Sequence, residues 1–139
     1  MFFSLIDKID ELTPGKSVVA TKSLAMSEEY LRDHFPKFPV MPGVLMIEAM
    51  TQASSWLVRA TEDFAHSMVV LKETRNVKFG QFLQPGQTLV VTSTIVSDTE
   101  NETVLKAQGS LQGSFLLLVQ TKRCPHSPLL VNARVLTHL

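Results

Sequence analysis

Residues 44–61 read VLMIEAMTQASSWLVRAT, which is the most regular apolar segment of the chain. It contains neither glycine nor proline, and it follows Pro42 and Gly43, an arrangement typical of a helix start. Apolar residues occupy almost every side of the helix that it predicts, whereas a surface helix would have a polar half. We therefore expect a long helix that is buried at the centre of the domain.

The polar residues of this helix follow a pattern. Glu48, Gln52, Ser55 and Arg59 are separated by four, three and four residues. At about 3.6 residues per turn they form one narrow stripe, which needs polar groups to face. Burying a carboxylate without partners costs several kcal/mol. We therefore expect Glu48 to be paired, protonated or directed into a cavity.

The flanking sequence is rich in Val, Thr, Leu and Ile, and turn-forming residues divide it into segments of strand length. The predicted strands cover residues 17–25, 67–79, 87–98, 102–112, 114–124 and 128–138. One buried helix with five or six strands indicates an α+β fold, in which a curved antiparallel sheet wraps the helix. No repeat or linker divides the chain. We expect one domain over residues 1–139, with about 124–139 as a C-terminal extension or an edge strand.

Composition excludes several classes of function. The net charge is zero, which argues against nucleic acid as a partner because such proteins present a basic face. The single cysteine, Cys124, allows no intrachain disulfide framework and argues against a cysteine-based metal site. The acidic N-terminus does not resemble a signal peptide, and no apolar run is long enough to span a membrane. We expect a cytoplasmic protein with no membrane partner.

The segment before the helix, residues 33–43, reads DHFPKFPVMPG. Pro36, Pro39 and Pro42 exclude a helix interior or a central strand, so they predict a stiff, extended loop with little entropy left to lose. His34 lies at the start of this loop. A histidine beside Phe and Pro is usually a packed loop residue, but this loop leads directly to the start of the helix that carries Glu48. His34 and Glu48 are therefore the candidate catalytic pair.

Residues 34–53, HFPKFPVMPGVLMIEAMTQA, resemble the signature of bacterial 3-hydroxyacyl-acyl-carrier-protein dehydratases of fatty-acid synthesis. The resemblance extends more weakly to residues 2–24 and 76–89. It implies the hotdog fold of that family, a long helix wrapped by an antiparallel sheet. The sequence departs from the family at Asp33 and Lys37, where glycine is usual or frequent.

The resemblance also implies a reaction and its residues. The family removes water from (3R)-3-hydroxyacyl thioesters on acyl-carrier protein, giving trans-2-enoyl thioesters. By this resemblance His34 is the base, Glu48 is the acid, the backbone N–H of Gly43 binds the thioester carbonyl, and Gln52 orients Glu48. The site is shared between the subunits of a homodimer, or of a higher oligomer built from dimers. No cofactor or metal is implied, because the phosphopantetheine arm belongs to the substrate.

Two other functions stay open at this point. A hotdog-fold acyl-thioester hydrolase needs an acid or nucleophile and an activated water, but no His-Phe-Pro loop. A non-catalytic acyl-thioester-binding subunit is compatible with Asp33 and Lys37, although such a subunit would not need both His34 and Glu48. Formation of an enoyl thioester separates the three possibilities in one assay.

Overall fold

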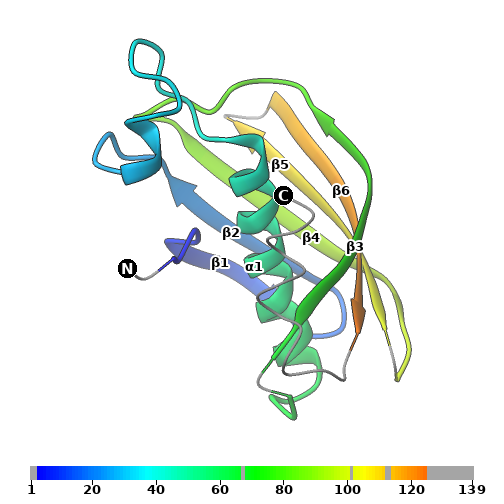
Figure 1. Cartoon of the computed structure of the whole chain (residues 1–139). Helices are drawn as coiled ribbons and strands as arrows, with labels where there is room; N and C mark the ends of the chain where they lie inside the picture. Colours follow the sequence, from blue (N-terminus) through cyan, green and yellow to red (C-terminus); the bar gives the residue numbers. More distant parts are fainter. Residues whose placement is uncertain (1–2, 67, 101, 112–113, 125–139) are drawn as a thin grey trace.

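The computed structural model describes residues 3–66, 68–100, 102–111 and 114–124 (Figure 1). The described chain contains one α-helix, one short 3-10 helix and six strands. Their bounds, in chain order, are β1 Lys8–Thr13, β2 Ser17–Ser23, η1 Glu29–Leu31, α1 Gly43–Thr61, β3 Val70–Phe79, β4 Thr88–Asp98, β5 Thr103–Leu111 and β6 Ser114–Cys124.

The six strands form one sheet in the order β1-β2-β4-β5-β6-β3, and every neighbouring pair is antiparallel. The sheet curves around α1, as Figure 1 shows. The helix packs mainly across β2, β4 and β5, while β1 and β3 are the edges of the sheet. The predicted α+β architecture is thus confirmed.

The core forms where the helix meets the central strands. Residues of β4 and β5 alternate between buried and more exposed positions, as the period of two along a strand requires. Leu89 and Val91 of β4 and Met50 and Leu57 of α1 are all fully buried. These contacts between segments far apart in the sequence fix the helix in the concavity of the sheet.

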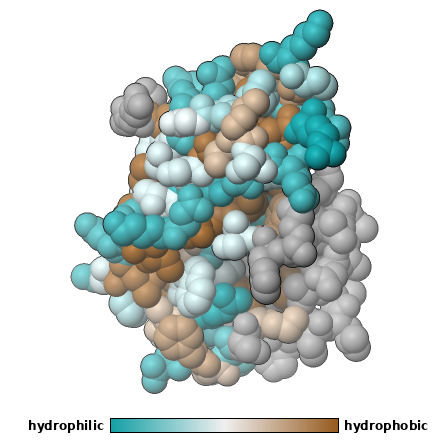
Figure 2. Space-filling model, turned by 90° about the vertical axis from the view of Figure 1, so that its left-hand side faces the viewer, coloured by the Kyte–Doolittle hydropathy of each residue, from teal (hydrophilic) through white to brown (hydrophobic). Residues whose placement is uncertain are grey.

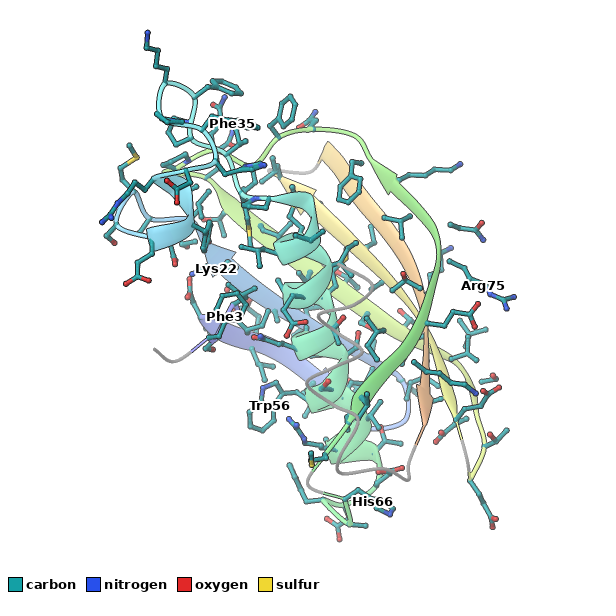
Figure 3. The ribbon with its side chains drawn as sticks, viewed as in Figure 1. Phe3, Lys22, Phe35, Trp56, His66 and Arg75 are labelled. Carbon is teal, nitrogen blue, oxygen red and sulfur yellow. The ribbon has the colours of Figure 1, made fainter. Side chains whose placement is uncertain are left out.

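The helix begins at Gly43, one residue before the predicted stretch, and it ends at Thr61 as predicted. It is the central helix of the fold, as predicted, and its core-facing side is buried, but its burial is incomplete. Val44 and Trp56 are 38% and 43% exposed, because the sheet covers only one side of the helix. Trp56 points away from the sheet (Figure 3). In the single chain, α1 therefore has one open flank.

The open flank belongs to a mixed surface. The face shown in Figure 2 has hydrophobic side chains exposed between hydrophilic ones. Among the described residues, the large apolar side chains that are exposed include Phe3, Phe35, Phe38, Val44, Trp56, Phe79 and Phe82. No helix among the described residues is long and apolar enough to cross a membrane.

The ends of the chain differ in how well they were predicted. The strand expected at 17–25 is β2, but β1 was not predicted, because its residues KIDELT are mostly exposed and show no regular alternation. β1 forms by pairing with β2. The predicted strand at 128–138 and the proposed extension at about 124–139 lie outside the described residues, apart from Cys124 at the end of β6.

Candidate active site

The loop that carries His34 closes on itself. The backbone N–H groups of Phe35 and Phe38 each donate to the other residue's carbonyl, at 3.1 Å, and Pro36 and Lys37 form the turn between them. The prediction of an extended loop was therefore wrong, because this segment forms a turn. The prolines limit the backbone as predicted, but the chain folds back between Phe35 and Phe38 before it reaches α1.

Val40 holds His34 at two points. Its N–H donates to the His34 carbonyl at 3.0 Å, and its carbonyl oxygen lies 3.1 Å from Nδ1 of the imidazole. A carbonyl only accepts hydrogen bonds, so Nδ1 must carry the proton. In the neutral ring Nε2 then has the free lone pair, which is the form that a general base requires. The ring of Phe35 stacks on the imidazole at 4.2 Å between centroids.

A buried lysine with two partly exposed carboxylates anchors the chain just before this loop. The ammonium group of Lys22 in β2 lies 2.6 Å from Glu28 and 3.5 Å from Asp7. Glu28 precedes η1, and Leu31 at the end of η1 is buried in the core. Lys22, labelled in Figure 3, therefore ties the segment before His34 to β2 of the sheet.

His34 and the start of α1 line one cavity of about 440 Å³. The backbone N–H of Met41 donates to the carbonyl of Leu83 at 2.9 Å and so anchors the segment just before α1. Pro42 is the N-cap residue and supplies no side-chain cap. Among the described residues, the N–H of Gly43 has no hydrogen-bond acceptor. This N–H and the positive end of the helix dipole are thus available to an oxygen atom in the cavity.

Glu48 lines a second cavity, of about 330 Å³, on the other flank of α1. Gln52 Nε2 donates to Glu48 Oε1 at 3.1 Å and to the Phe3 carbonyl at 3.0 Å, and Gln52 Oε1 accepts from the Leu5 N–H at 2.8 Å. The amide of Gln52 is therefore fixed between Glu48 and the N-terminal segment. The whole polar stripe, Glu48, Gln52, Ser55 and Arg59, lines this cavity, as its spacing predicted.

The structure brings Glu48 and Gln52 together, and it brings His34 and Gly43 together. It does not place the two pairs in one cavity, because His34 lines the first and Glu48 lines the second. Sequence reasoning missed Val40 and Phe79 as contributors to the His34 cavity, since nothing in the local pattern marks either residue. Among the described residues, no cluster of His, Cys, Asp or Glu could hold a metal ion.

Comparisons with known proteins agree with this architecture. A dehydratase heterocomplex, ApeI:P from Xenorhabdus doucetiae, has a TM-score of 0.70 at 20% identity, over 88% of this chain and 99% of its own. A Streptococcus mutans protein solved with acetyl CoA has a TM-score of 0.69 at 15% identity, over 91% of this chain and 93% of its own. At these identities the likeness concerns the fold, and the chain is a hotdog-fold protein.

The family follows from sequence similarity. The model of the FabA-like domain matches residues 1–120. The chain is 42% identical over 101 residues to the 3-hydroxyacyl-acyl-carrier-protein dehydratase FabZ of Pediococcus pentosaceus, covering 73% of this chain and 68% of the relative. It is 35% identical over 127 residues to the FabZ of Rickettsia bellii, covering 86% of this chain and 88% of the relative. The chain belongs to the FabA-like family and is an enzyme of its dehydratase class.

Proposed function

We propose that this chain removes water from (3R)-3-hydroxyacyl thioesters carried on acyl-carrier protein and forms trans-2-enoyl thioesters for fatty-acid or related acyl synthesis. The names of its relatives support the reaction and the carrier. The observation that supports the mechanism most directly is that His34 shares a cavity with the N–H of Gly43. In the part of the chain that the structure describes, neither His34 Nε2 nor this N–H has a hydrogen-bond partner.

The elimination assigns one task to each group. Nε2 of His34 takes the proton from the carbon next to the thioester carbonyl, and the negative charge that develops on the carbonyl oxygen is stabilised by the Gly43 N–H. The bond from the next carbon to its hydroxyl oxygen then breaks. Glu48 gives its proton to this oxygen, which leaves as water. His34 ends with one proton more and Glu48 with one fewer, and exchange with solvent resets both.

Gln52 has a supporting task. Its amide is held by two backbone groups of the N-terminal segment, so its hydrogen bond to Glu48 fixes the direction of the carboxyl group. The acyl group arrives on the phosphopantetheine arm of the carrier, and no metal or nucleotide takes part. The absence of a cofactor and the cytoplasmic location stay predictions.

The acid and the base act together across a dimer. Within one chain they line cavities on different flanks of α1, and the exposed Val44 and Trp56 together with the edge strand β3 offer a surface for a second copy. In this dimer His34 of one subunit faces Glu48 of the other. Each dimer then has two sites, and a monomer has none that is complete.

Mixed dimers test this arrangement. His34→Ala and Glu48→Gln are each inactive as homodimers, and a dimer that contains one of each has one intact site and one doubly altered site. After subunit exchange by mild unfolding and refolding, about half of the dimers are mixed. Enoyl-thioester formation should then return to about a quarter of the activity of the unmodified enzyme, if the sites act independently.

Three controls make the result decisive. Each variant refolded alone should stay inactive, and subunit exchange is verified by mass spectrometry of the mixed dimers. His66→Ala, at an exposed histidine that pairs with Glu62 beyond the end of α1, should keep full activity. Full exchange without recovered activity would overturn the shared site. Release of free thiol in place of the enoyl product by the unmodified protein would identify a hydrolase instead.

A further inference from the structure

The first residue of α1 lies against an aromatic ring. A Cβ atom built on Gly43 would lie 2.7 Å from Cε1 and 2.8 Å from Cζ of Phe79, which is closer than two unbonded carbon atoms approach. Phe79 is the last residue of β3, and its side chain is 52% exposed. The ring therefore rests on the Gly43 backbone, and position 43 has no room for a side chain while the ring stays there.

An irregularity in β3 precedes this ring. The pairing of β3 with β6 shifts register between Arg75 and Lys78, and Asn76 has a φ of 55° within the shift. An extra residue in one strand turns the following side chains to the opposite face of the sheet. Val77 packs against the core, and Phe79, two positions later, lies on the same face. The bulge thus directs Phe79 towards the helix.

The ring and the open end of the helix belong to the same cavity. Gly43 and Phe79 both line the cavity that contains His34. An apolar ring beside a backbone donor displaces water and lowers the local polarity, and both effects strengthen a hydrogen bond from that donor to a developing negative charge. Phe79 needs no contact with the reacting atoms to act in this way.

We propose that Phe79 is a positioning residue for the thioester. Its ring shields the Gly43 N–H from water on the side where the ring rests. This inference rests on the proposed function, because it assumes that the Gly43 N–H receives the thioester carbonyl. It also gives a reason why glycine is required at position 43: any side chain there would push the ring out of the cavity.

A double-mutant cycle tests the coupling between the two residues. Loss of a donor of this kind typically lowers kcat by about 10²–10³-fold. Phe79→Ala removes only its shielding, so we expect kcat to fall about 10-fold and KM to change little. Gly43→Ala should have a similar effect, because the added methyl group displaces a ring that has solvent to move into. The chain should therefore still fold, with its Tm nearly unchanged.

The cycle predicts that the two changes are not additive. In the Phe79→Ala background the methyl group of Gly43→Ala has room, and it should lower kcat by less than about twofold. Phe79→Leu should recover most of the activity, since a large apolar group again covers the helix end. Phe64→Ala, at another exposed phenylalanine located after α1, is the matched control and should behave as the unmodified enzyme. An equal loss from Gly43→Ala in both backgrounds would overturn the proposal.

A spectroscopic measurement separates this proposal from the proposed function. The ultraviolet band of a bound enoyl thioester moves to longer wavelength when its carbonyl is polarised by hydrogen bonds. In the His34→Ala background, which does not turn over, saturating crotonyl-pantetheine should show this shift, and added Phe79→Ala should reduce it. An unmodified protein that never forms enoyl thioester contradicts the proposed function. A protein that forms it, with an additive cycle and an unchanged band, contradicts only the role of Phe79.

Discussion

At the scale of single residues, the hydroxyl group of Tyr30 is a polar group whose burial no hydrogen bond offsets. Its hydroxyl is buried and has no hydrogen-bond partner among the described residues. Burial is the main reason that the pKa of Tyr30 is raised, and the negative charges of Glu28 and Asp7 raise it further. The folded chain therefore keeps this proton at a pH at which an ordinary tyrosine loses it.

The raised pKa of Tyr30 makes stability fall in alkali. The unfolded chain loses the Tyr30 proton at about pH 10, whereas the folded chain retains it to higher pH. The contribution of the raised pKa to the free energy of unfolding is thus complete below that pH. It is lost as the pH rises above it. Urea unfolding should show that Tyr30→Phe removes this alkaline dependence. It should not lower stability at neutral pH, because the hydroxyl that it removes is unsatisfied.

The direct check uses the fact that the chain has one tyrosine. Tyrosinate absorbance of the folded protein then reports Tyr30 alone. An ordinary tyrosine titration curve in the folded state would contradict the burial of this hydroxyl.

Ser54 and Ser93 are a second pair of buried polar groups, and each satisfies the other. Their hydroxyl oxygens are 2.7 Å apart between α1 and β4. Either change to alanine leaves one hydroxyl without a partner, and we expect a loss of about 1–3 kcal/mol in the free energy of unfolding. The double variant should be less destabilised than the sum of the two single variants. Denaturant unfolding of all four proteins measures the coupling, and strict additivity would show that the hydrogen bond is absent.

At the scale of elements, the bulge in β3 depends on Asn76. A φ of 55° is left-handed backbone, which asparagine and glycine adopt more easily than β-branched residues do. We expect Asn76→Val to lower the free energy of unfolding by about 1–2 kcal/mol, whereas Asn76→Gly should change it little. Thermal and urea unfolding of the two variants provide the measurement.

The same pair of variants connects the element to the site. If the bulge directs Phe79, Asn76→Val should also lower kcat, and Asn76→Gly should keep it. Equal stability of the two variants would mean that the register shift does not need this residue.

At the scale of the whole molecule, the open flank of α1 predicts a dimer. Light scattering should give at least twice the chain mass of 15.5 kDa. Trp56→Asp places a charge on the exposed flank and should dissociate the dimer, with loss of enoyl-thioester formation but an unchanged circular dichroism spectrum. Val96→Asp, at an exposed apolar residue of β4, is the control and should stay dimeric and active. An active monomer would contradict the shared site.

Features that depend on local periodicity could be predicted from the sequence alone. The helix at 43–61, the strands from β2 to β6 and the stripe that ends at Arg59 follow from spacing along one segment. His34 could be found because three prolines restrict the segment after it. β1 could not be predicted in this way, because pairing with β2, rather than a pattern of its own, makes it a strand.

The surroundings of these residues depend on tertiary contacts. The Val40 carbonyl that fixes the tautomer of His34 depends on a turn between them. The ring on Gly43 depends on a bulge in a strand that is distant in the sequence. The division of His34 and Glu48 between two cavities depends on how the loop and the helix pack against the sheet. Such contacts are set by register and packing, which a local pattern does not contain.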